Sequence, residues 1–122
     1  MPIIDVTLVL PKGEEISKTL AHALADALGT AMALPAGRLW VRLSRHAASL
    51  YAENGVPPHL TPHPVFVDVL HAHLPGGEAL KIEAQAIAGA VAACTGREND
   101  AIHVTYAPPG AGRVAFGGKL IE

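Results

Sequence analysis

Two periods of hydrophobic residues follow one another at the start of the chain. Residues 2–10, PIIDVTLVL, are apolar and largely β-branched except at Asp5 and Thr7, which predicts a strand covered on both faces. Large apolar residues then recur every four positions, as on one face of a helix, at Ile16, Leu20, Leu24, Leu28 and Met32. Residues 39–43 combine large apolar side chains with a basic one, which is typical of a partly exposed strand. The pattern predicts strand, helix and strand.

The second half of the chain repeats this order. Residues 64–78, PVFVDVLHAHLPGGE, align with residues 2–15 with one added residue on each side of a shared Asp-Val, and they keep the order Pro, Asp-Val and Leu-Pro-x-Gly. A helical stripe follows and stops before Gly96, with apolar residues at Leu80, Ala84, Ile87, Val91 and Cys94. Residues 100–107, DAIHVTYA, predict the second strand of this repeat.

These elements organise the 122 residues as a single domain. The first βαβ unit covers about residues 2–46, and the second covers about residues 64–107. The linker at about 52–63 is rich in proline and contains an Asn-Gly pair, and residues 110–122 form a glycine-rich terminal hairpin. Because βαβ units are right-handed, we expect an α/β (α+β) fold with a four-stranded sheet and two helices on one face. The other face would be bare and apolar, so we expect it to pack against further copies of the chain.

Composition adds three expectations. Half of the residues are hydrophobic but only 4% are aromatic, and the many alanines give flat helix faces that favour association between subunits. The net charge is -2 and the basic residues are scattered, so neither nucleic acid nor a membrane surface is an expected partner. One cysteine, no segment of signal-peptide type and no run long enough to span a membrane together predict a soluble cytoplasmic protein.

Pro2 is an unusual start for a strand, because proline lacks the N–H that a sheet ladder uses. If Met1 is removed, Pro2 becomes a free secondary amine, and methionine before a small residue is generally removed. An α-amino group has a pKa of about 7.7 to 8.0, and desolvation or a nearby cation lowers it toward the range of a general base. Lys12, where the first strand turns toward the first helix, is the nearest cation in the sequence. From its position alone, a proline after Met1 is more often a coincidence than a catalytic residue, so a catalytic role for Pro2 depends on features elsewhere in the chain.

Taken together, these features resemble the tautomerase superfamily, which includes 4-oxalocrotonate tautomerase, macrophage migration inhibitory factor and malonate semialdehyde decarboxylase. The resemblance rests on the initial Met-Pro and β-branched strand, the doubled βαβ unit, a basic residue at position 12, LPAG at 34–37 and FGGKL at 116–120. It implies that Met1 is lost, that Pro2 acts as general base or acid, and that the chain forms a homotrimer.

Only some of the site residues of this superfamily have counterparts in the sequence. Lys12 stands where 4-oxalocrotonate tautomerase has a substrate-binding arginine, which keeps the charge and loses the bidentate fork. The second family arginine corresponds to Trp40 in the first repeat and His103 in the second. Arg38 stands where malonate semialdehyde decarboxylase has its catalytic aspartate, and HAHLP at 71–75 lacks the arginine pair of that enzyme. Decarboxylation and hydrolytic dehalogenation are therefore not expected.

The resulting hypothesis is a trimeric tautomerase for a small 2-keto or 2-hydroxy-enoic acid. Pro2 would move the proton, and Lys12, with Arg42 or Arg45, would hold the substrate carboxylate and stabilise the dienolate. His103 would join the site from the second repeat at a subunit boundary. This mechanism requires no cofactor and no metal.

Two alternatives remain open at this stage. The chain contains four histidines in and after the linker that could make it a non-catalytic, metal-binding trimeric module: His59, His63, His71 and His73. It could also be a relative of the tautomerases whose activity has decayed, since the family arginines are missing. Metal analysis and activity measurements separate these possibilities.

Overall fold

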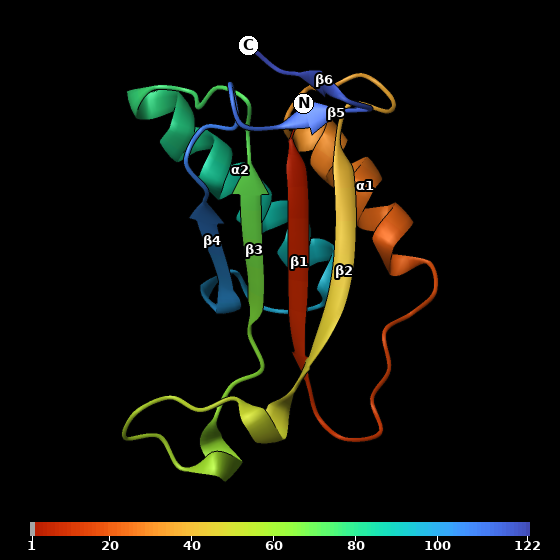
Figure 1. The fold of residues 1–122 in the computed structure, drawn as a ribbon. Coiled ribbons are helices and arrows are strands. Elements are labelled where there is room, and N and C mark those ends of the chain that lie inside the picture. Colours follow the sequence, from red (N-terminus) through yellow and green to blue (C-terminus); the bar gives the residue numbers. More distant parts are fainter. Residues whose placement is uncertain (1) are drawn as a thin grey trace.

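The computed structural model describes residues 2–122. Its main sheet has four strands in the order β2-β1-β3-β4 (Figure 1). The strands are β1 (Ile3–Leu10), β2 (Trp40–Ala47), β3 (Val65–Leu70) and β4 (Ile102–Tyr106). Parallel pairs join β1 to β2 and β3 to β4, while β1 and β3 are antiparallel. The predicted four-stranded sheet is confirmed.

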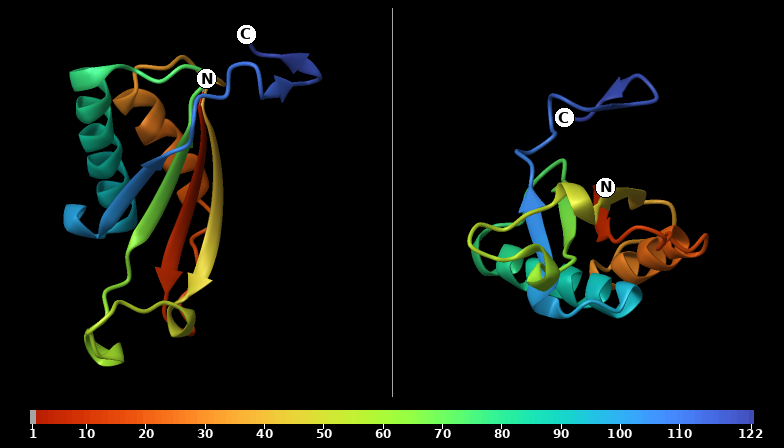
Figure 2. Two further views of the ribbon diagram at one scale, coloured as in Figure 1. Left: turned by 60° about the vertical axis from the view of Figure 1, so that its left-hand side comes forward. Right: turned by 90° about the horizontal axis from the view of Figure 1, so that it is seen from below.

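Both helices cover one face of this sheet, as predicted (Figure 2). Helix α1 (Leu20–Ala31) follows β1, and helix α2 (Gly77–Thr95) follows β3. Helix α2 ends at Gly96, which adopts the left-handed conformation at φ 70° and donates its N–H to the Ala92 carbonyl. No helix within residues 2–122 is both long and apolar enough to cross a membrane.

Helix α1 begins later than its apolar stripe suggests. Ile16 continues the stripe toward the N-terminus, but it packs against the core from the loop that precedes the helix. In that loop the Ser17 hydroxyl accepts the Thr19 N–H at 3.3 Å, so a local side-chain turn replaces the first helical turn.

The two repeats are related by a half turn about the centre of the sheet. Asp5 and Asp68, from the shared Asp-Val pairs, lie directly opposite each other on β1 and β3. Because the two first strands run in opposite directions, the end of β1 lies beside the start of β3. The Val9 N–H there donates to the Pro64 carbonyl at 3.0 Å. Equivalent positions of the two repeats therefore lie at opposite ends of the molecule.

The core lies between the sheet and the helices. Alternate residues of each strand face it, as the period of a strand requires. Its fully enclosed side chains include Ile4, Val6, Leu24, Leu28, Val65, Val67, Val69, Ile87 and Val91.

The face of the sheet away from the helices, called here the open face, differs from the expectation. Its middle is polar rather than continuously apolar, with side chains from Asp5, Thr7, Arg42, Ser44, Asp68, His103 and Thr105. These seven polar residues share one alternation, so all of them fall on this face. The open face is therefore not the bare apolar surface that the sequence led us to expect for association between copies of the chain.

The C-terminal tail forms a small hairpin of β5 (Ala115–Phe116) and β6 (Lys119–Leu120), joined by two glycines with positive φ. Figure 2 shows that this hairpin extends beyond the sheet on the side away from the helices, close to the N-terminus. The Phe116 ring meets Trp40 of β2 edge to face, with ring centroids 4.7 Å apart. This contact ties the tail to the end of the sheet where β1 begins.

Candidate active site

Pro2 lies at the entry to the central strand β1. Its side chain is fully buried, and its carbonyl accepts the Trp40 N–H at 3.1 Å. Proline is tolerated here because it precedes the first residue of the strand, where its missing N–H breaks no ladder bond. Met1 lies outside the described residues, so its removal stays a prediction.

The aromatic pair beside Pro2 is partly exposed. Trp40, 40% exposed, follows the turn at 34–37 and donates its indole N–H to the Gly37 carbonyl at 3.2 Å. Phe116 covers one edge of the indole from the C-terminal hairpin. The Pro2 end of the sheet therefore has an apolar, aromatic border.

Lys12 does not lie near Pro2 of the same chain. Strand β1 spans eight residues, which is about 26 Å, and Lys12 follows its far end. The half-turn relation of the repeats instead places Lys12 at the end of the sheet where β3 begins. The expectation that Lys12 lowers the pKa of its own Pro2 amine is therefore wrong within a single chain.

Arg45 is the cation that the structure places with Lys12. The two side chains line a cavity of about 450 Å³, together with the backbone turn at residues 47–49. The Arg45 guanidinium also donates to the Pro11 carbonyl at 2.7 Å, which holds it over the end of β1. Two positive charges in one cavity are suited to a carboxylate.

Arg42 serves a different purpose. It shares the open face with Trp40, as predicted, and donates to both carboxylate oxygens of Asp5 at 2.6 and 2.8 Å. This hydrogen bond, and then the charge of Asp5, raise the pKa of the guanidinium further above its ordinary value. Arg42 therefore neutralises a carboxylate of its own chain and does not line the cavity of Lys12 and Arg45.

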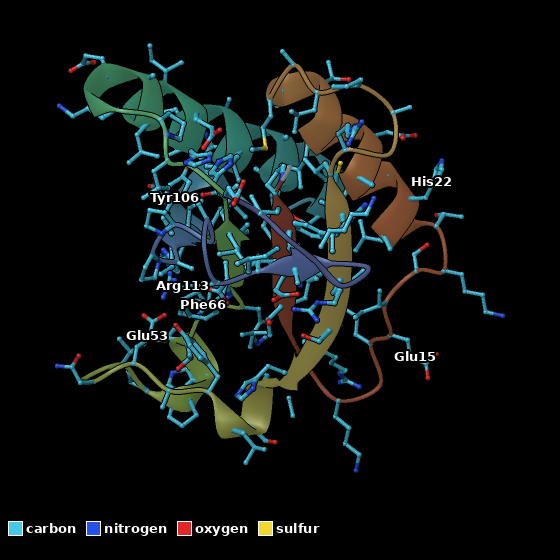
Figure 3. The ribbon with its side chains drawn as sticks, turned by 45° about the horizontal axis from the view of Figure 1, so that its top comes forward. Glu15, His22, Glu53, Phe66, Tyr106 and Arg113 are labelled. Atoms are coloured by element: carbon cyan, nitrogen blue, oxygen red, sulfur yellow. The ribbon has the colours of Figure 1, made fainter. Side chains whose placement is uncertain are left out.

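His103 lies on the edge strand β4, also at the end of the sheet away from Pro2. Its ring is tilted against Phe66 with centroids 5.4 Å apart. It lines a cavity of about 610 Å³ together with Glu53, His63 and Arg97. Figure 3 labels Glu53 in this region and Tyr106 toward the opposite end. Like Lys12, His103 can reach a Pro2 site only from another subunit.

The four histidines of the metal hypothesis do not form one cluster. His59 and His63 precede β3, whereas His71 and His73 follow it, and the six residues of β3 span about 20 Å. His71 is buried, and His73 instead lies against the Glu122 carbonyl at 3.1 Å. Among residues 2–122, no three histidine, cysteine, aspartate or glutamate side chains are grouped as metal ligands would be. The shared metal site that the sequence suggested is therefore wrong.

A buried polar network lies at the Pro2 end and was not predicted. The His71 ring nitrogen Nε2 is 2.9 and 3.1 Å from the two carboxylate oxygens of Glu83 on α2, and the Tyr106 hydroxyl donates to the same carboxylate at 2.7 Å. The His71 and Glu83 side chains are only 11% and 14% exposed. Burial, followed by the bond to Glu83, raises the pKa of the Tyr106 hydroxyl well above its ordinary value.

The sequence did contain a signal for this network. Glu83 falls within the apolar stripe of α2, three positions after Leu80 and four before Ile87, where a carboxylate requires a partner. His71 and Tyr106 continue the core-facing alternation of β3 and β4. Three polar residues at core positions, at the same end of the fold, predict that they contact one another.

No protein-family model matches this sequence, and no curated protein matches it. Solved structures match nearly the whole chain. A fused 4-oxalocrotonate tautomerase (4-OT), a symmetric trimer, superposes with a TM-score of 0.75 and 19% identity over 98% of this chain and 94% of its own. MIF2 of Leishmania major superposes with a TM-score of 0.75 and 17% identity over 99% of this chain and 97% of its own.

A third match is the FG41 malonate semialdehyde decarboxylase inhibited by 3-bromopropiolate, with a TM-score of 0.66 and 19% identity over 94% of this chain and 90% of its own. All three structures are of tautomerase superfamily members. The three matches cover 94–99% of this chain and therefore include both βαβ units. This chain therefore has the fold of the tautomerase superfamily.

Proposed function

We propose that this protein is a tautomerase whose general base is the N-terminal amine of Pro2, and that its substrate is a small 2-keto or 2-hydroxy-enoic acid. The observation that carries the proposal is the place of Pro2. It is the residue that enters the central strand of a tautomerase fold, and its ring is fully buried. Without Met1, that position presents a secondary amine.

The chemistry is proton transfer between carbon and oxygen. The neutral Pro2 amine removes a proton from one position of the substrate and, as the ammonium, returns it to another, so the enzyme is regenerated. Burial disfavours the charged ammonium and lowers its pKa from the usual range of about 7.7 to 8.0, which keeps part of the amine neutral at physiological pH.

The proposed active site requires more than one subunit. Lys12 follows the far end of β1, Arg45 lies opposite Leu8, and His103 lies level with Thr7, so all three are at least five strand positions from Pro2 of their own chain. We propose a homotrimer in which a neighbour brings these residues to Pro2, and the symmetric trimer of the fused 4-OT structure supports that arrangement. The Lys12 and Arg45 cavity would hold the carboxylate, and its charge would stabilise the dienolate as negative charge develops on oxygen. His103 is the polar group offered by the edge strand β4.

The test uses protein whose intact mass shows that Met1 is absent. Turnover of phenylenolpyruvate and 2-hydroxymuconate is compared between the wild type, Pro2→Ala and a chain carrying one additional alanine before Pro2. The added residue converts the proline nitrogen into an amide, which has no basic lone pair. We expect it to lose at least about 100-fold in kcat/KM, in line with the loss of a general base.

Pro2→Ala serves as the matched comparison. It keeps a small second residue, so Met1 is removed equally, and it replaces the secondary amine with a primary one. We expect an intermediate loss, carried mainly by kcat. Undiminished turnover in the alanine-extended chain would rule out Pro2 as the base.

A further inference from the structure

Exposed apolar side chains gather at the two ends of the sheet. Among residues 2–122, five large apolar side chains are exposed: Trp40, Leu50, Leu60, Ile82 and Leu120. Leu50 and Leu60 lie in the loop at 48–63, whereas Trp40 and Leu120 lie at the Pro2 end, on β2 and on the C-terminal hairpin. Figure 1 shows the loop and the hairpin at opposite ends of the sheet. Strand β2 separates the two patches by about 26 Å, so they do not cover each other within one chain.

The two leucines of the 48–63 loop are held on short hydrogen-bonded turns. The Leu60 N–H donates to the Pro57 carbonyl at 3.0 Å, and the turn that ends at Leu50 is closed by the Tyr51 N–H at 3.1 Å. The Tyr51 ring also lies against Phe66 of β3, with centroids 5.9 Å apart. The loop therefore presents its leucines in a fixed arrangement, which reduces the entropy lost when they bind a partner.

A second copy of the chain is the partner that fits both patches. Two different patches at opposite ends of one chain give a head-to-tail contact, and such contacts can close into a ring in which every patch is covered. The charges of the two segments have opposite signs. With histidines neutral, the 48–63 loop carries only Glu53, whereas residues 110–122 carry Arg113 and Lys119 against Glu122. This difference favours loop against hairpin over the contact of two like ends.

The loop patch is continuous with the cavity that holds the two cations of the proposed site. Ser49 lines that cavity, and Leu50 is the next residue. On the opposite patch, the Trp40 N–H donates to the Pro2 carbonyl at 3.1 Å. A contact between Leu50 of one chain and Trp40 of the next therefore sets the cavity of the first chain beside Pro2 of the second.

We infer that Leu50 and Leu60 of one chain pack on Trp40 and Leu120 of the next, and that this contact brings the two cations to the proline amine. The second part rests on the proposed function, whereas the contact itself requires only that the chains associate. Its driving force is the removal of the exposed leucine and tryptophan side chains from water.

The experiment follows association and the surroundings of Trp40 in the same samples. Sedimentation velocity over a dilution series gives the concentration at which chains associate, and acrylamide quenching reports the exposure of Trp40, the single tryptophan. In the wild type, the quenching should fall as the chains associate. Leu50→Asp should raise the concentration required for association by about 10- to 100-fold, and Trp40 should stay open to quenching up to that concentration.

Two further variants complete the comparison. Leu120→Asp changes the opposite patch and should weaken association as Leu50→Asp does. Ile82→Asp is the matched control, because Ile82 is 63% exposed, close to the 65% of Leu60. It lies on α2, on the helix side of the sheet, whereas the hairpin extends to the other side (Figure 2). This control should leave both association and quenching unchanged. All three side chains are exposed, so the substitutions leave the core intact.

The outcomes separate the contact from the proposed function. A wild type that stays a single chain at every concentration, or a Leu50→Asp chain that associates as the wild type does, overturns the inference. Weakened association of Leu50→Asp without loss of turnover supports the contact and overturns its role in bringing the cations to Pro2. Association that depends on Leu50, in a protein whose wild type turns over neither enol acid, supports the contact and overturns the tautomerase assignment.

Discussion

Asp5 and Asp68 lie directly opposite each other at the centre of the sheet, at equivalent positions of the two repeats. Like charges in this arrangement repel, and of the two carboxylates only Asp5 forms an ion pair within residues 2–122, with Arg42 at 2.6 Å. The half-turn repeat thus brings two carboxylates together, and an arginine from only one repeat offsets them. The opposing pair follows from the equivalent positions of the Asp-Val pairs in the two repeats.

We expect Asp68→Asn to stabilise the protein. Removing one of two facing charges should raise the free energy of unfolding by about 0.2 to 1 kcal/mol at neutral pH and low salt. Chemical denaturation measures this, and added salt should shrink the difference between variant and wild type. In the same assay Arg42→Gln should be destabilising in the wild type and less so beside Asp68→Asn. Equal effects of Arg42→Gln in both backgrounds would contradict the coupling.

The single tryptophan should report on the C-terminal hairpin. Trp40 is the only tryptophan of the chain, and Phe116 packs on it edge to face at 4.7 Å. We expect Phe116→Ala to shift the fluorescence emission to longer wavelength, because the indole becomes more hydrated, and to cost about 0.5 to 1.5 kcal/mol of stability. Phe116→Leu keeps much of the apolar cover and should shift the emission less. Emission that is unchanged by Phe116→Ala would mean that the hairpin does not rest on Trp40 in solution.

Alkaline titration should show both tyrosines ionising late. The Tyr51 hydroxyl donates to Glu53 at 2.6 Å, and this bond raises the pKa of Tyr51 to about 12. Burial and Glu83 raise the pKa of Tyr106 as well. We therefore expect almost no tyrosinate absorbance in the folded protein below about pH 11, against a midpoint of about 10 in the unfolded chain.

The raised pKa values of the two tyrosines also predict the direction in which the free energy of unfolding changes with pH. Since the folded pKa values lie above the unfolded ones, the stabilisation is fully present below about pH 10 and is lost as pH rises through the folded values. The free energy of unfolding should therefore fall above about pH 10. Tyr106→Phe should weaken this fall, whereas a folded protein whose tyrosines titrate with a midpoint near 10 would contradict both hydrogen bonds.

The fold could be predicted because its signals are local and repeated. The β-branched run of β1, the stripe of α2 that stops at Gly96 and the Asp-Val pairs each specify an element through nearby residues. The site could not be predicted equally well, because it depends on how the two repeats face each other. Lys12 is near Pro2 in the sequence, yet the extended strand β1 carries it to the other end of the sheet, and the antiparallel β1–β3 pair brings the end of β3 to the Pro2 end instead.

The start of α1 is a second feature that the sequence pattern did not locate correctly. The apolar period continues back to Ile16, but the Ser17 hydroxyl competes for a backbone N–H and delays the helix to Leu20. The stripe therefore predicted which residues face the core and missed which backbone conformation brings them there.

Mixing two inactive variants should restore activity if the active site spans subunits. Pro2 and the Lys12 and Arg45 cavity lie about 26 Å apart in one chain, so a small substrate cannot touch both. Chains extended by alanine before Pro2 lack the base, and Lys12→Ala/Arg45→Gln chains lack the carboxylate site. Each should be inactive alone, the second mainly through a raised KM. After the two are unfolded together and refolded in equal amounts, about a quarter of the sites should combine an intact Pro2 with an intact neighbouring cavity.

The control for this mixing is to refold each variant separately and then combine them without exchange, which should leave both inactive. The Lys12→Ala/Arg45→Gln chain also needs its own comparison, so Lys12→Arg/Arg45→Lys is refolded beside it, since exchanging the two cations keeps both charges in the cavity. Restored activity of about a quarter of the wild-type value places Pro2 and the two cations in one site made by different chains. If the Lys12→Ala/Arg45→Gln chain alone turns over substrate with an unchanged KM, the cavity has no part in binding the carboxylate. The groups that bind the carboxylate must then lie at the Pro2 end of the sheet, where His71 and His73 also lie.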